Sequence, residues 1–110
     1  VHVVSLGDNM VGIVHPCKIY GSMAVARPVL FLGPRPSHVS DLIDAHPFGV
    51  HVSHGDTAGA EAAILELAAR SEVELQKMGM TAQNVMASSL TKDILCGKLC
   101  DRLQSILRDK

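Results

Sequence analysis

Residues 15–33, HPCKIYGSMAVARPVLFLG, decide the fold, because a short helical segment is followed at once by a buried strand. From Pro16 to about Ala26 the apolar side chains recur at helical spacing, and proline favours the first turn of a helix. Pro28 cannot sit inside that helix, and the run PVLFLG after it is typical of a buried strand. A helix that leads directly into a buried strand indicates one crossover of a parallel sheet.

The same alternation extends in both directions along the chain. Strands are expected at residues 1–6, 28–33 and 48–54, and helices at 16–26, 38–46, 57–70, 72–88 and 92–108. Ser37 and Asp56 precede two of these helices and are expected to be their N-caps. Strands that alternate with helices predict an α/β fold, a Rossmann-like parallel sheet with flanking helices and right-handed crossovers.

Composition argues against two classes of partner. Ten basic and eleven acidic side chains give a net charge of −1, so no broad field attracts nucleic acid or anionic membrane. Aromatic residues make up 3% of the chain, too few for the stacking platforms of a single-stranded nucleic-acid binder. We therefore expect no nucleic-acid partner, and any anion site must be local.

The cysteines and histidines indicate a reducing compartment and no metal site. Cys17, Cys96 and Cys100 form no CxxC pair, and the last two are expected to pack as small hydrophobic side chains on the final helix. No two histidines show HxxxH spacing on one helix. The chain also has no apolar run of about 18 residues and no charged signal-peptide start, so we expect a cytoplasmic protein.

The first strand suggests that the chain is part of a larger protein. The run VHVVSL at residues 1–6 begins without a methionine, a cap or a preceding turn, and a strand buried on both faces rarely opens a natural chain. Three strands are also too few for a complete doubly wound sheet. We expect residues 1–110 to form a single domain that is the distal fragment of a longer protein.

The loop after the first strand is a candidate anion site. In an open parallel sheet, ligands gather at the carboxyl ends of the strands. Gly7 and Gly12 let the backbone approach a ligand, and the helical turn from Pro16 is expected to present unpaired N–H groups. Lys18 would add a full charge beside a phosphate, although a lysine there is also compatible with a plain surface position. The loop matches neither GxxxxGK[ST] nor GxGxxG.

His15 leaves two interpretations open. Beside Pro16, its imidazole could contact a phosphate or exchange a proton, or it could simply be a solvated side chain at a loop edge. Asp8 and Asn9 in the same loop are interpreted as turn-forming residues.

Two stretches of the sequence resemble one enzyme family. The runs KIYGSMAVARPVLFLGP (18–34) and GVHVSHGDTAGAEAAILEL (49–67) are similar to the C-terminal nucleotide-sugar-binding domain of GT-B glycosyltransferases, particularly family four. Members typically show Pro-Ser-Lys, a helix ending in Met-Ala-x-Gly-[Lys/Arg]-Pro-Val, then Gly-x-x-Val and a Gly-Asp that opens a helix. The matching residues are Pro16, Lys18, Met23, Ala24, Arg27, Pro28, Val29, Gly49, Val50, Gly55 and Asp56. The resemblance covers about residues 1–70, and the helical tail is similar to the closing helices of such a domain.

The resemblance implies a two-domain enzyme of polysaccharide or glycoconjugate biosynthesis. Its C-terminal half would bind a UDP- or GDP-sugar as donor substrate, without a metal or other cofactor, and a missing N-terminal half would bind a sugar or lipid-linked acceptor. The full-length enzyme would transfer the sugar, with room for peripheral membrane association, whereas this fragment alone would be inactive. The implied donor-binding residues are Gly12, Ile13, Val14, His15, Pro16, Cys17, Lys18 and Gly21. No catalytic residue is implied.

The chain also departs from the family pattern. Many relatives carry two glutamates eight residues apart, and the corresponding positions here are Ile13 and Gly21, whose side chains cannot hydrogen-bond. The usual glycine before Arg27 is Ala26, and the usual serine of Pro-Ser-Lys is Cys17. The alternative hypothesis is therefore a non-catalytic nucleotide-binding or interaction module with the same fold. A flavodoxin-like regulatory domain is disfavoured, because the first two strands end without a phosphorylatable aspartate.

Overall fold

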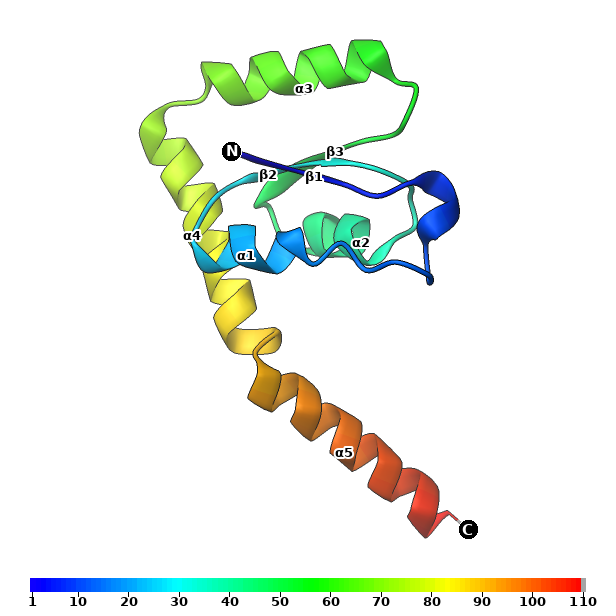
Figure 1. The fold of residues 1–110 in the computed structure, drawn as a ribbon. Helices are drawn as coiled ribbons and strands as arrows, with labels where there is room; N and C mark the ends of the chain where they lie inside the picture. The colour runs from blue at the N-terminus through cyan, green and yellow to red at the C-terminus, as the bar shows by residue number, and fades with distance from the viewer. Residues whose placement is uncertain (110) are drawn as a thin grey trace.

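A three-stranded parallel sheet lies at the centre of the computed structural model, which describes residues 1–109 (Figure 1). The strands are β1 (His2–Ser5), β2 (Val29–Leu32) and β3 (Gly49–Val52), in the order β1-β2-β3. Leu30 of β2 lies in register with Val3 on one side and with Val50 on the other. The predicted α/β fold with a parallel sheet is confirmed.

Helices lie on both faces of this sheet, while the last helix extends away from it. They are η1 (Asp8–Met10), a short 3-10 helix, and α1 (Lys18–Ala24), α2 (His38–Ala45), α3 (Thr57–Ala69), α4 (Glu72–Ser89) and α5 (Lys92–Arg108). Figure 1 shows α1 and α2 below the sheet, α3 above it, and α4 running from the end of α3 past α1. Within residues 1–109, no helix combines the length and apolar character needed to cross a bilayer.

Local sequence signals account for where these helices begin. The Ser37 hydroxyl accepts from the Ser40 N–H, and the Ser40 hydroxyl accepts from the Ser37 N–H, which forms a capping box at the start of α2. The Asp56 carboxylate accepts from the Gly59 N–H at 2.8 Å at the start of α3. Both predicted N-caps are confirmed, so the polar residues that end each loop set the direction of the following helix.

The central strand β2 is buried on both faces. Val29 and Phe31 face the layer of α1 and α2, where they pack with Ile19, while Leu30 faces Leu67 of α3. Such burial on both faces explains why PVLFLG is apolar throughout instead of alternating with polar residues.

β1 is less buried than its sequence predicts. Val4 is buried with Ile19, but Val3, on the opposite face of the sheet, is 59% exposed, because α3 leaves a hollow over this edge strand. The expectation of a strand buried on both faces is wrong for β1 in this structure.

α5 also differs from expectation, since none of its residues is buried. Figure 1 shows it extending away from the sheet. Its leucines Leu95, Leu99 and Leu103 are exposed, and so are Cys96 and Cys100. The prediction that these two cysteines pack as small hydrophobic side chains is therefore wrong, because no other element of residues 1–109 covers this helix.

Ala26, which links α1 to β2, holds a backbone conformation that suits glycine. Its φ is +53°, in the left-handed region that costs an L-residue about 1–2 kcal/mol. We expect Ala26→Gly to raise the free energy of unfolding by about 0.5–1 kcal/mol. The rest of the relieved strain is offset by the greater conformational freedom of glycine in the unfolded chain. Urea unfolding measures the change. Ala62→Gly, inside α3, is the control and should destabilise by about 1 kcal/mol. An Ala26→Gly chain that unfolds at lower urea than the parent would contradict the strain argument.

Candidate functional site

The segment from Gly7 to Cys17 joins the carboxyl end of β1 to α1. It folds on itself: the Met10 N–H donates to the Gly7 carbonyl at 3.0 Å, and the Val14 N–H donates to the Met10 carbonyl at 2.9 Å. Gly12 has a φ of +79°, so glycine is needed at this turn. The segment therefore has a defined backbone although η1 is its only regular element within the described residues.

Apolar side chains of this segment are open to solvent. Ile13 is 77% exposed, and Met10, Val11 and Val14 are also exposed. Three of the predicted donor-binding residues, Gly12, Ile13 and Val14, thus lie on the surface beside the carboxyl end of β1.

The start of α1 differs from the prediction that its first N–H groups are unpaired. The N–H groups of Cys17, Ile19 and Tyr20 donate to the carbonyls of His15, Pro16 and Cys17, at 2.9, 3.2 and 3.2 Å. These tight turns lead into the first residues of a helix that begins at Lys18, two residues later than Pro16, and has only seven residues. The expectation of unpaired N–H groups is wrong for these three residues, so the candidate anion site depends more on the charge of the Lys18 side chain.

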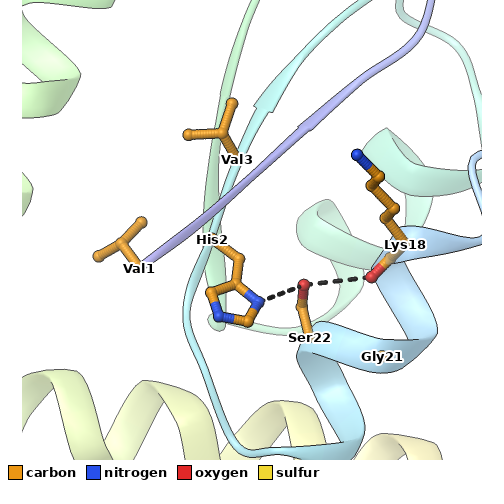
Figure 2. Close-up of a pocket in the computed structure, with 6 residues that line it drawn as sticks. All are labelled: Val1, His2, Val3, Lys18, Gly21 and Ser22. Atoms are coloured by element: carbon orange, nitrogen blue, oxygen red, sulfur yellow. Dashed lines mark hydrogen bonds between the residues drawn. The ribbon is translucent and has the colours of Figure 1, made fainter.

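Lys18 borders a shallow hollow along the outer edge of β1. The hollow has a volume of about 450 Å³ and is lined by Val1, His2, Val3, Lys18, Gly21 and Ser22 (Figure 2). The Ser22 hydroxyl donates to the Lys18 carbonyl at 3.1 Å, so His2 Nδ1 must donate to the Ser22 oxygen, 2.9 Å away. Figure 2 shows the Lys18 side chain extending away from this pair. Its ammonium forms no salt bridge with any residue between 1 and 109.

A second hollow places Lys18 at the carboxyl end of β1. Its volume is about 240 Å³, and it runs along β1 from Val3 to Ser5, the last residue of the strand, with Pro16 and Lys18 on its other side. This is the position where the sequence predicts an anion. The structure thus brings Pro16 and Lys18 together beside the end of β1, while Gly21 borders the neighbouring hollow.

His15 belongs to a different cluster. The Tyr20 hydroxyl lies 2.6 Å from His15 Nε2 and 3.0 Å from His38 Nε2, and the two imidazole centroids are 5.0 Å apart. Burial, and secondarily the nearby Cys17, raises the pKa of Tyr20 above its ordinary value. Burial, and secondarily the charge of His15, lowers the pKa of His38, while Asp41 opposes that shift. His15 is therefore exposed but hydrogen-bonded to Tyr20, and it does not line the Lys18 hollows.

Two further histidines connect the ends of the strands. His51 Nε2 donates to the Gly33 carbonyl at 2.7 Å, and His54 Nε2 donates to the Leu6 carbonyl at 2.8 Å. Both bonds hold the loops at the carboxyl edge of the sheet in place. Among residues 1–109, no group of three or more histidine, cysteine, aspartate or glutamate side chains is arranged to hold a metal ion.

No protein-family model matches the chain, and neither a curated protein nor a solved structure shows significant similarity to it. The structure and its residues are therefore the basis for the functional conclusion.

Sequence reasoning missed Tyr20 and His38 as members of a polar cluster. His15 and His38 are separated by a helix and a strand, so no short motif joins them. They meet because α1 and α2 lie on the same face of the sheet, where the ring of Tyr20 from α1 lies beside both histidines. The one indication in the sequence was that two successive right-handed crossovers of a parallel sheet place their helices on the same face.

Proposed function

We propose that this chain is the donor-binding part of a glycosyltransferase of the GT-B type. Its donor substrate is a UDP- or GDP-sugar, and its acceptor is a sugar or lipid-linked sugar held by another domain of the full-length, cytoplasmic enzyme. The observation that carries the proposal is the Lys18 ammonium, which is free of salt bridges within residues 1–109 and borders the hollow at the carboxyl end of β1.

The position of Lys18 suits a diphosphate. Ligands of open parallel sheets bind beyond the carboxyl ends of the strands, and the hollow reaches that end of β1 at Ser5 and Pro16. An ammonium held at that point would stabilise the charge that develops on a leaving nucleoside diphosphate. The proposed step therefore needs one positioned charge from this chain and is compatible with a site that uses no metal.

The open edge of β1 supports the view that the sheet is larger in the full-length protein. Val3 lies exposed on this edge strand, above an apolar hollow that also contains Ile64 and Leu67 of α3. Soluble proteins seldom leave a strand edge and an apolar surface uncovered together. In our proposal, another strand of the same Rossmann-like domain pairs with β1 and covers the hollow along its outer edge, whereas the donor diphosphate binds beyond Ser5, next to Pro16 and Lys18.

Lys18→Ala tests the proposed donor site. We expect isothermal titration with UDP- and GDP-sugars to show affinity weakened by about 1–3 kcal/mol, or about 5- to 150-fold, because a charge-assisted hydrogen bond is lost. Lys98→Ala is the matched control, since Lys98 is an exposed lysine of α5, which extends away from the sheet. Equal affinity in the parent and the Lys18→Ala variant would remove Lys18 from the site.

The second candidate function is a non-catalytic nucleotide-binding or interaction module. It is favoured by Ile13 and Gly21, which occupy the positions of the two family glutamates: the first is an exposed apolar side chain, and the second has none. Cys17 stands where the family has a serine, and its thiol donates to the His15 carbonyl at 3.4 Å. Nucleotide release by the full-length protein in the presence of acceptors distinguishes the two functions, because a module would bind nucleotide without turnover.

A further inference from the structure

We propose that Tyr20 and His38 are positioning residues for the segment Gly7–Pro16, which they hold in place through His15. His15 lies at the end of this segment, Tyr20 is in α1, and His38 is the first residue of α2. The Tyr20 hydroxyl bonds to both imidazoles, so one phenol oxygen links the segment to two helices.

The segment has few other connections to the fold. Its backbone hydrogen bonds from Met10, Ile13 and Val14 close on the segment itself. Its apolar side chains are exposed and do not belong to either core cluster. Among the described residues, the side-chain hydrogen bond from His15 to Tyr20 is the one that ties residues 7–15 to a helix. Loss of that bond should therefore loosen the segment without disturbing the sheet.

The proton count of the cluster sets its pH dependence. With both imidazoles neutral, the Tyr20 O–H donates to one of them and the other donates its N–H to the phenol oxygen. With both protonated, each imidazole can only donate, the phenol proton has no acceptor in the cluster, and two cations face each other at 5.0 Å. The arrangement is therefore more stable when at least one histidine is neutral.

The surroundings of the cluster favour the neutral form of His38. Its pKa is lowered by burial and by His15, against the opposing charge of Asp41, and Cys17 is the other titratable group beside Tyr20. Because the folded pKa of His38 lies below its unfolded value, its contribution is complete above the ordinary histidine range. The contribution is lost as the pH falls through that range to the folded pKa. We therefore expect the segment to be held at neutral pH and loosened at acidic pH.

This inference deepens the proposed function and rests on it only where the donor is concerned. Gly12, Ile13 and Val14 lie within the held segment, and Lys18 follows it directly. A bond from His15 to Tyr20 would thus keep the backbone near Lys18 in one arrangement before a sugar nucleotide arrives, which lowers the ordering cost of binding.

Amide hydrogen exchange tests the proposal directly. Tyr20→Phe removes the shared hydroxyl and keeps the ring, His38→Asn removes one partner, and His46→Asn at the far end of α2 is the matched control. At pH 7.5 we expect exchange of residues 7–15 to rise about fivefold in Tyr20→Phe and His38→Asn, with β2 and β3 unchanged and His46→Asn equal to the parent. After correction for intrinsic rates, exchange of residues 7–15 in the parent should rise as the pH is lowered from 7.5 through the folded pKa of His38, and Tyr20→Phe should show no such pH-dependent rise.

The outcomes separate this inference from the proposed function. Unchanged exchange of residues 7–15 in both Tyr20→Phe and His38→Asn would overturn the positioning role, whatever the chain binds. Faster exchange in these variants supports the positioning role, even if titration with UDP- and GDP-sugars detects no binding. Absence of sugar-nucleotide binding would count against the glycosyltransferase proposal alone.

Discussion

Replacing Gly79 with alanine is expected to lower the free energy of unfolding by about 3 kcal/mol. Gly79 is buried in α4 and faces the end of α1. A Cβ atom there would overlap the carbonyl oxygen of Ala26, and it would lie 2.6 Å from the carbonyl carbon and 3.3 Å from the Arg27 nitrogen. All three atoms belong to the backbone, so no side-chain rotation relieves the overlap.

The cost arises because α4 must separate from α1. Ala82 and Val85, one and two turns further along α4, are buried in the core beside α1, so a shift of α4 would open contacts well beyond Gly79. Inside a helix, alanine is also intrinsically more favourable than glycine by about 1 kcal/mol. A net loss in the free energy of unfolding would therefore mean that the overlap costs more than this gain.

Gly97→Ala is the matched control for this prediction. Gly97 also lies inside a helix, α5, but its Cβ would meet no atom within 4 Å. Urea unfolding followed by circular dichroism should show Gly97→Ala at or slightly above the parent and Gly79→Ala far below it. If the two variants unfold together, the close approach of α4 to α1 is wrong.

The order of elements was predictable because local signals and tertiary packing agree. Alternating apolar strands and amphipathic helices gave the parallel sheet, and Ser37 and Asp56 gave two helix starts because an N-cap acts within three residues. The helix predicted to begin at Pro16 begins two residues later, because the carbonyls of His15 and Pro16 accept from N–H groups that a regular first turn would leave unpaired. Local chemistry therefore predicted element type better than element boundary.

Exposure and side-chain clustering could not be predicted in the same way. The residues of α5 are apolar enough to suggest burial, but burial depends on which other surface is present to cover them. The bond between Tyr20 and His38 depends on the position of α1 beside α2, which no spacing in the sequence encodes. For the candidate site, Lys18 and the glycine-bearing loop stay a prediction from the sequence, whereas the cluster of His15, Tyr20 and His38 became visible only in three dimensions.

Phe31→Ala is expected to have the largest effect on stability, about 3–5 kcal/mol. Phe31 is 0% exposed at the centre of β2, the middle strand. Its ring faces the layer of α1 and α2 and lies 5.5 Å, between centroids, from the ring of His51. Alanine would remove the ring and leave a cavity between strands that are hydrogen-bonded on both sides and cannot easily close around it.

Two controls keep this prediction measurable in a small domain, where total stability is about 5–15 kcal/mol. Phe31→Leu retains most of the volume and should cost less than about 1.5 kcal/mol, so it gives a value even if Phe31→Ala is unfolded. Val73→Ala, on the exposed face of α4, should change stability by about 0.5 kcal/mol or less. A Phe31→Ala chain as stable as Val73→Ala would show that the ring is not packed in the core.

Phe31→Leu also tests how core packing affects the proposed donor site. Phe31 belongs to the cluster that contains Val4 of β1 and Ile19 of α1, and these two elements place Lys18 at its hollow. Phe31→Leu should therefore weaken sugar-nucleotide affinity less than Lys18→Ala does, because it preserves the packing that positions the ammonium. Equal losses in the two variants would mean that affinity follows core packing and not the charge of Lys18, and titration of both variants under identical conditions decides between these causes.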